Sequence, residues 1–221
     1  MAARTSRIHL GTGVIDLRYE NPLYFAEDAG AADLIAGERL QLGVSRGSPE
    51  QVIEGYKYFG YQPDEGKTDA DMGREHTEFM LKVLEGGGFA QPNPRPMFPN
   101  PPGLLRIEPH SEGLRERIWW GAASDATARW AASTGMHLMS STLKADESGE
   151  PLHVQQRRQI QRLPPMGAEV RAVEYAFGAD EIQRAFSRLR HQFAADKGRP
   201  VVVALRPGAQ RPQRALFHVT Q

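Results

Sequence analysis

RIHLGTGVIDLRYENPLYFAEDAGAADLIAGERLQLGVSRGS, residues 7–48, is the stretch that decides the fold, and its pattern predicts a strand, a helix and a second strand. The apolar runs at residues 8–14 and 40–44 have the length of buried strands. Two buried strands joined by one helix form a βαβ unit, so we expect parallel strands and a right-handed crossover. The sequence therefore predicts an α/β fold, in which ligands bind at the carboxyl ends of the strands.

The helix inside this stretch has clear start and stop signals. Asn21 is a good N-cap, and Pro22 suits the first helical position because a missing N–H costs nothing there. Gly37 suits the left-handed conformation that often ends a helix. We expect its apolar face to contain Leu23, Ala26, Ala29, Leu34 and Ile35.

Two more helices are expected before the third strand. A capping box with proline, SPEQ at residues 48–51, predicts a short helix that ends near Tyr58. Thr68 begins the next helix, which ends near Glu85 because three glycines follow at residues 86–88.

The second half of the chain continues the alternation of strands and helices. Ser124 caps a helix that ends at Thr134, before Gly135. Apolar residues at helical spacing predict a last helix at residues 180–197. The five predicted strands are residues 8–14, 40–44, 118–123, 137–141 and 201–205.

A long proline-rich loop is expected at residues 89–116, and loops of this length are often functional. Met97 and Phe98 either contact a substrate or simply cover a sheet edge, and His110 is an acid–base candidate. His76, in the middle of a charged helix, is expected to be solvated. Four aromatic residues pack in the core or line a ligand pocket: Tyr56, Tyr58, Phe59 and Tyr61.

The composition excludes several classes of function. Of the 221 residues, 27 are Lys or Arg and 27 are Asp or Glu, so net charge gives no reason to expect nucleic acid or an anionic membrane as partner. The absence of cysteine excludes disulfides and thiolate chemistry and fits a reducing compartment. No run of signal-peptide or membrane-spanning character is present, so we expect a cytoplasmic protein with no membrane partner, and no motif indicates a metal site.

A phosphate site is predicted where the strand at residues 118–123 meets the next helix. The N–H groups and positive dipole end of a helix N-terminus attract phosphate, and Ser124 and Thr127 add two hydroxyls one turn apart. Arg46, at the end of another strand, would add a fixed positive charge. The alternative is that Ser124 serves only as an N-cap. Asp125 would repel phosphate, and we expect it to face solvent.

Three blocks of sequence resemble the bacterial luciferase-like monooxygenase family, and they occur in family order. The first consists of RIHLGTGV, NPLYFAED and GERLQLGVSRG within residues 7–47. The second is IWWGAASDATARWAA at residues 118–132, and the third, weaker one is GEPLHVQQ at residues 149–156. Together they cover roughly the first 160 residues.

The resemblance implies a flavin-dependent TIM barrel. Because the first predicted strand matches the family's third, we expect a partial (β/α)8-type barrel that lacks the first two βα units. Residues 1–162 would form the luciferase-like segment and residues 163–221 a diverged helix–strand segment of the same domain.

The resemblance also implies the cofactor and its contacts. FMN is expected, with the deazaflavin F420 as the alternative. Gly13 and Val14 would carry a non-prolyl cis peptide behind the flavin ring. Arg46, Ser124 and Thr127 would hold the phosphate, and Ala123 would contribute main chain. The family's active-site histidine has no counterpart here, so no catalytic residue can be named.

Three functions remain open at this point. The first is a monooxygenase-like oxidoreductase that uses reduced FMN and O2 on a small organic substrate, with the reduced flavin supplied by a separate reductase. The second is a non-catalytic or vestigial flavin-binding protein, and the third is an F420-dependent oxidoreductase. Open sheet edges in a partial barrel would favour a homodimer.

Overall fold

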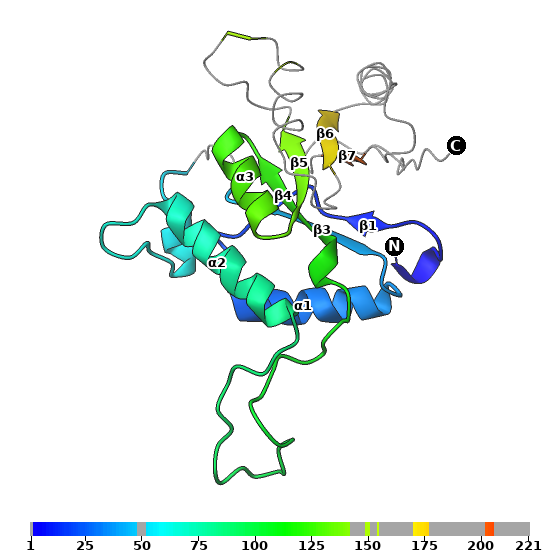
Figure 1. Cartoon of the computed structure of the whole chain (residues 1–221), viewed down its shortest axis with the longest axis vertical. Helices are drawn as coiled ribbons and strands as arrows, with labels where there is room; N and C mark the ends of the chain where they lie inside the picture. The colour runs from blue at the N-terminus through cyan, green and yellow to red at the C-terminus, as the bar shows by residue number, and fades with distance from the viewer. Residues whose placement is uncertain are drawn as a thin grey trace. The chain divides into compact units, whose positions relative to one another are not determined.

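The computed structural model describes residues 2–47, 52–141, 149–150, 154, 170–176 and 202–205. The chain divides into two compact units, one formed by residues 1–11 and 15–118 and the other by residues 12–14 and 119–221 (Figure 1). The predicted helix at residues 180–197 and the predicted boundary after residue 162 lie outside the described residues. No helix among the described residues is long and apolar enough to cross a membrane.

In the first unit, a 3-10 turn η1 (Ala2–Arg4) precedes two short strands, β1 (Leu10–Gly11) and β2 (Ile15–Asp16). Both pair in parallel with β3 (Leu40–Ser45), so the predicted parallel arrangement is confirmed. The single strand predicted at residues 8–14 is wrong, because the ladder with β3 is interrupted at residues 12–14, where the structure has a cis peptide between Gly13 and Val14.

The helix α1 (Pro22–Ile35) connects the parallel strands β2 and β3, which confirms the predicted strand–helix–strand unit. The Asn21 side chain accepts hydrogen bonds from the amides of Leu23 and Tyr24, and Gly37 has the expected positive φ of 64°. The predicted apolar face is partly wrong. Leu34 and Ile35 are 46% and 73% exposed, whereas the buried face consists of Pro22, Ala26, Ala29, Gly30 and Asp33.

Small residues on this buried face allow the backbone at Pro109, in the long loop, to approach the helix closely. A Cβ atom placed on Gly30 would lie 2.3 Å from the carbonyl oxygen of Pro109. The face therefore packs through small residues, of which apolar spacing alone identified Ala26 and Ala29 but not Gly30 or Asp33.

A buried carboxylate ties α1 to the rest of the unit. Asp33 accepts hydrogen bonds from the amide of Leu40, at 2.9 Å, and from the hydroxyl of Ser111, at 2.6 Å. It also forms an ion pair with Arg117, in the 3-10 turn η3 (Arg115–Arg117) that precedes β4. Because a buried charge must be paired, this arrangement fixes the start of β3 against the end of the long loop.

The helix α2 (Asp69–Leu84) packs against α1 and has the predicted extent. Thr68 and Asp71 form a capping box at its start. The short helix expected at residues 48–58 is wrong within the described part of that range. Glu54 has a positive φ of 50°, which an α-helix cannot accommodate, and the chain forms only the 3-10 turn η2 (Gly55–Phe59).

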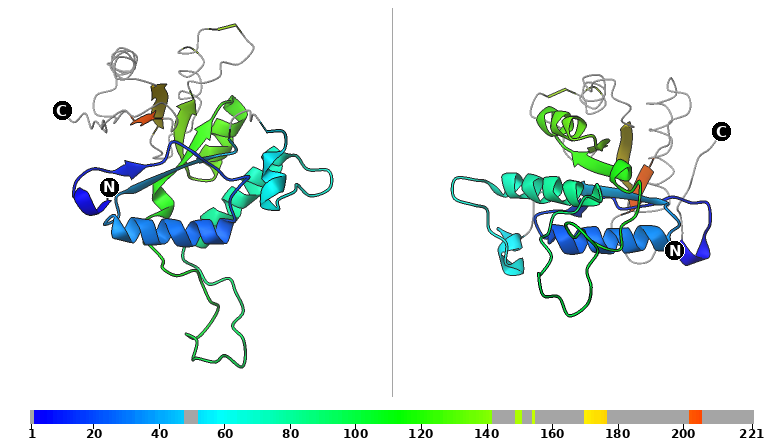
Figure 2. Two further views of the ribbon diagram at one scale, coloured as in Figure 1. Left: turned by 180° about the vertical axis from the view of Figure 1, so that it is seen from behind. Right: turned by 60° about the horizontal axis from the view of Figure 1, so that its bottom comes forward.

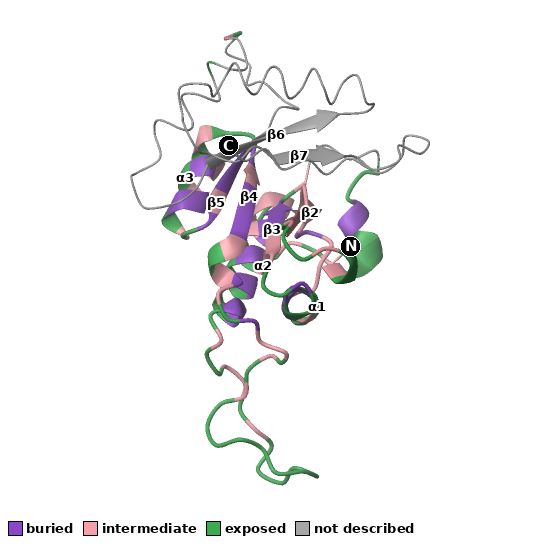
Figure 3. Cartoon of the chain, turned by 90° about the vertical axis from the view of Figure 1, so that its right-hand side faces the viewer, coloured by how far each residue is buried: buried purple, intermediate pink, exposed green. Residues whose placement is uncertain are grey.

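The proline-rich loop between α2 and η3 extends away from both helices of the first unit (Figure 2). Its base is closed by an antiparallel bridge between Ala90 and Leu105. Beyond this bridge most residues are exposed, including Met97 at 90% and Phe98 at 75% (Figure 3). The alternative that these two side chains cover a sheet edge is therefore not supported.

In the second unit, β4 (Ile118–Ala122), β5 (His137–Ser141), β6 (Val170–Ala176) and β7 (Val202–Leu205) pair in parallel, each with the next. The helix α3 (Asp125–Ser133) is the crossover between β4 and β5. The strand β6 was absent from the sequence prediction. Taken together, the two units confirm an α/β fold of parallel strands with crossover helices.

The residues of β4 alternate between two apolar layers. Trp119 packs with Met139 and Val14 on one face, and its ring stacks on His137 at a centroid distance of 4.3 Å. Trp120 points to the other face, where its ring meets Trp130 of α3 edge to face. The strand is therefore covered on both faces, as a strand of a parallel sheet must be.

Candidate functional site

The start of α3 has the geometry expected of a phosphate site. Ser124, the N-cap, and Ala123 before it are exposed. The amide of Thr127 lies 3.4 Å from Ser124 Oγ, and the amide of Ser124 lies 3.4 Å from Thr127 Oγ1. These two N–H hydrogen bonds are long, but the Thr127 hydroxyl also donates to the carbonyl oxygen of Ser124 at 3.0 Å and lies 3.1 Å from Ser124 Oγ, so a bound oxyanion would have to displace ordinary contacts as well. Two hydroxyls and the first-turn N–H groups form a donor set that fits a phosphate.

The same unit contains the predicted cis peptide between Gly13 and Val14. Val14 packs on Trp119 and Met139, so this segment lies against the side of the sheet opposite to α3. Asp125, expected to face solvent, is half-buried instead.

Arg46 lies in the first unit, directly after β3, and its side chain is 48% exposed. It belongs to a cluster with Asp16, Arg18 and Asp69. Arg18 is buried and donates to both carboxylate oxygens of Asp16, with Nη2 2.6 Å from Oδ2. Its Nη1 donates to Asp69 Oδ2 at 2.6 Å, and Arg46 Nη1 lies 3.9 Å from that same oxygen.

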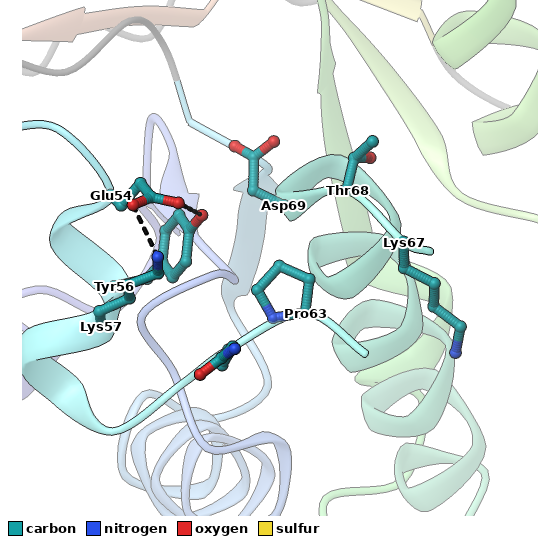
Figure 4. A pocket seen from close by; sticks show the side chains of 8 residues that line it. Glu54, Tyr56, Lys57, Pro63, Lys67, Thr68 and Asp69 are labelled. Carbon is teal, nitrogen blue, oxygen red and sulfur yellow. Dashed lines mark hydrogen bonds and ion pairs between the residues drawn. The ribbon is translucent and has the colours of Figure 1, made fainter. Parts of the chain in front are cut away.

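A polar pocket of about 350 Å³ opens beside this cluster, at the start of α2 (Figure 4). Its walls include Tyr56, whose hydroxyl lies 3.4 Å from Glu54 Oε1, and Asp69. Burial, reinforced by the charges of Glu54 and Asp69, raises the pKa of Tyr56, so the phenol stays protonated at neutral pH. The remaining walls are Lys57, Gln62, Pro63, Lys67 and Thr68.

A protein-family model matches most of this chain. A model of the luciferase-like monooxygenase family matches residues 1–159. The chain belongs to the luciferase-like monooxygenase family. The resemblance seen in the three sequence blocks is thereby confirmed.

Two curated relatives are similar in sequence to this member of the family. Protein y4wF of Sinorhizobium fredii is 31% identical over 140 residues, which are 62% of this chain and 38% of that protein. The 4-hydroxyprotoasukamycin monooxygenase of Streptomyces nodosus subsp. asukaensis is 49% identical over 47 residues, which are 21% of this chain and 13% of that enzyme. The chain thus spans less than two fifths of either relative.

Solved structures share the fold at low sequence identity. Monooxygenase RslO1 of Streptomyces bottropensis is 20% identical with a TM-score of 0.54, over 88% of this chain and 58% of that one. The oxygenating constituent of 3,6-diketocamphane monooxygenase from Pseudomonas putida, in complex with FMN, is 17% identical with a TM-score of 0.53 over 88% and 57%. The F420-dependent tetrahydromethanopterin reductase of Methanopyrus kandleri is 18% identical with a TM-score of 0.52 over 88% and 62%.

Five of the six predicted cofactor-binding residues of this family member belong to the second unit. Ala123, Ser124 and Thr127 are contiguous at the end of β4, and Gly13 and Val14 belong to the same unit. Arg46 belongs to the other unit. The roles of all six residues toward a cofactor stay predictions.

The two candidate histidines and some of the candidate aromatic residues contact other described residues of the protein. His76, predicted to be solvated, has its Nδ1 2.8 Å from the carbonyl oxygen of Leu17 and meets Tyr61 edge to face. Of the four aromatic residues, Tyr56 lines the pocket, whereas Tyr58 and Phe59 are largely exposed. The ring of His110 fills the space beside Gly86, where a Cβ atom would lie 2.6 Å from Nε2.

Sequence reasoning missed Arg18 and its two carboxylate partners. The available signal was the spacing D-x-R at residues 16–18, which begins at the last residue of β2. An aspartate side chain readily accepts a hydrogen bond from the amide two residues later and so favours a turn, and here Asp16 accepts from the amide of Arg18 at 3.0 Å, which brings the arginine back to the carboxylate. Asp69 could not be linked to it, because 51 residues separate it from Arg18.

Proposed function

We propose that the protein is a flavin-dependent monooxygenase-like oxidoreductase that uses reduced FMN and O2 on a small organic substrate. The observation that carries this proposal is the family match over residues 1–159. The exposed donor set at the start of α3 supports it, because FMN carries a phosphate that such a set can bind. The FMN complex of the Pseudomonas putida enzyme shows that FMN binds to a protein of similar fold.

In this proposal the protein's own residues bind and orient the cofactor. Ser124 and Thr127 hold the phosphate through hydroxyl and amide donors, and Arg46 adds positive charge. Ala123 contributes main chain, and Gly13 and Val14 support the ring system. Bound reduced flavin would supply the chemistry of O2 activation, while the protein positions the substrate and excludes water. A separate cytoplasmic reductase would provide the reduced flavin.

An F420-dependent oxidoreductase is the second candidate, because one of the similar folds belongs to an F420-dependent enzyme. A non-catalytic flavin-binding protein is the third, because the chain spans only part of each protein that it matches. Binding and turnover therefore need separate measurements.

The first test is a titration with FMN, followed by quenching of flavin fluorescence. We expect saturable quenching in the wild type and about tenfold weaker binding in Arg46→Ala and in Ser124→Ala, since each loses a phosphate contact. Ser133→Ala, at the opposite end of α3, is the matched control and keeps wild-type affinity. Absence of quenching in a folded sample contradicts the FMN proposal, and the titration is then repeated with F420.

Turnover separates an enzyme from a binding protein. Reduced FMN, O2 and a medium-chain aldehyde are mixed with the protein, and the oxidised product is quantified by mass spectrometry. Product above the protein-free control supports the oxidoreductase. Tight FMN binding without product from a panel of organic substrates favours the non-catalytic alternative.

A further inference from the structure

A four-residue ion cluster of alternating charge connects β2, β3 and the start of α2 in the first unit. It consists of Asp16, Arg18, Asp69 and Arg46, in that order of contact. Asp16 ends β2, Arg46 follows β3, and Asp69 is the first residue of α2. Among the described residues, two cations and two anions balance in charge.

Two glycines make room for the cluster, which shows that it is built into the fold. Gly47 has a φ of 77°, and a Cβ atom there would lie 1.9 Å from Asp16 Oδ2 and 2.6 Å from Arg18 Nη2. On α2, a Cβ atom on Gly73 would lie 3.2 Å from Arg18 Cγ and 3.3 Å from Arg46 Cβ. Larger residues at either position would push the arginines away from their places.

The two arginines differ in burial and in how closely they are paired. Arg18 is only 5% exposed, so its charge must be compensated inside the protein, and Asp16 and Asp69 both do this at 2.6 Å. Arg46 is half exposed, and its Nη1 is 3.9 Å from Asp69 Oδ2, beyond hydrogen-bonding distance. Asp69 is therefore held by Arg18 and attracts Arg46 without occupying its guanidinium donors.

We propose that Asp69 is a positioning residue for Arg46. Anchored by Arg18, it holds the Arg46 guanidinium at the end of β3 by charge attraction, and no hydrogen bond to another described residue takes up the donors that would meet an incoming phosphate. The inference rests on the proposed function, in which Arg46 contacts the cofactor phosphate, and adds a residue that acts through it. Prepositioning of a long side chain lowers the entropy lost when the anion binds.

The binding test compares FMN with riboflavin, which lacks the phosphate, on wild type and Asp69→Asn. We expect FMN to bind about fivefold more weakly to the variant and riboflavin to bind equally to both. Asp64→Asn is the matched control, since it removes the same charge from an exposed residue before α2 whose partner is Lys67. In the double variant Asp69→Asn/Arg46→Ala, FMN affinity falls no further than in Arg46→Ala alone.

Two binding outcomes overturn the inference. Tighter FMN binding to Asp69→Asn means that Asp69 competes with the phosphate instead of positioning its partner. Equal weakening for FMN and riboflavin means that the substitution acts through general structure.

A second measurement needs no flavin and therefore separates this inference from the proposed function. The arginine Nε–H signals are recorded by nitrogen-15 NMR, and that of Arg46 is assigned from its loss in Arg46→Lys. We expect the Arg46 signal to be distinct in the wild type and to move to the averaged position of mobile arginines in Asp69→Asn. The Arg18 signal stays in place, because its Nε donates to Asp16, and so reports an intact fold. An unchanged Arg46 signal overturns the inference even if the wild type binds no FMN.

Discussion

Asp33 is the residue whose loss is expected to damage the first unit most. It is fully buried, and its carboxylate joins Leu40, Ser111 and Arg117. In Asp33→Asn the cation of Arg117 loses its partner, so we expect the free energy of unfolding to fall by about 3 kcal/mol. Urea unfolding followed by circular dichroism measures this change. Asp28→Asn, on the exposed side of the same helix, should change it by less than about 0.5 kcal/mol.

Asp71 is expected to give α2 a stability that depends on pH. Hydrogen bonds from the hydroxyl and amide of Thr68, and then a hydrogen bond from Arg74, lower the pKa of Asp71 from 3.8 to about 2. A carboxyl with a lowered pKa stabilises the folded state above its ordinary pKa, and this contribution is lost as pH falls through the folded value. The melting temperature of Asp71→Asn should therefore lie below that of the wild type at neutral pH.

Melting temperatures at low pH show whether ionisation of Asp71 causes the difference. Between pH 3.8 and about 2 the two melting temperatures should converge, because the wild-type carboxyl becomes protonated. A constant difference between wild type and Asp71→Asn at every pH would mean that shape, and not ionisation, explains the loss.

The packing of α1 depends on Gly30, although glycine is unfavourable inside a helix. Alanine normally favours a helix over glycine by up to about 1 kcal/mol. At Gly30, however, the new Cβ would lie 2.3 Å from the backbone of Pro109, which cannot move as a flexible side chain would. We expect Gly30→Ala to lower the free energy of unfolding by about 2 kcal/mol in urea titrations. Gly87→Ala, which has open space around the new methyl group, is the control.

The sequence predicted the helices of both units better than their strands. Caps made of local residues, such as Asn21 and Thr68, set helix ends within one or two positions. Long-range pairing set the strands. Residues 8–14 read as one strand, yet the ladder with β3 is broken at the cis peptide of Gly13 and Val14. The turn at Gly55 depends on the left-handed conformation of Glu54, which no propensity favours.

In the candidate site, too, contacts within one short segment could be predicted from the sequence, whereas contacts between distant segments could not. Ser124 and Thr127 could be predicted because one capping box contains both. The exposure of Ser124 and the long N–H hydrogen bonds between the two residues appear only in the structure. The cluster around Arg18 joins residues from three elements, so no local pattern could reveal that Asp69 lies between Arg18 and Arg46.

The whole chain carries equal numbers of positive and negative side chains, 27 of each, and this balance should govern its solubility. Near pH 7 little net repulsion separates two copies, so we expect the lowest solubility there. Net charge of either sign should therefore raise solubility. Precipitation by polyethylene glycol at pH 7 measures the effect.

A charge reversal on the exposed loop tests whether net charge is the cause. Arg95→Glu changes the net charge by two units from zero, so solubility at pH 7 should increase and its minimum should move to lower pH. Arg95→Lys keeps the charge and should behave as the wild type does. If Arg95→Glu has no effect, association depends on apolar surface instead, and Met97 and Phe98 on the same loop are the side chains to replace next.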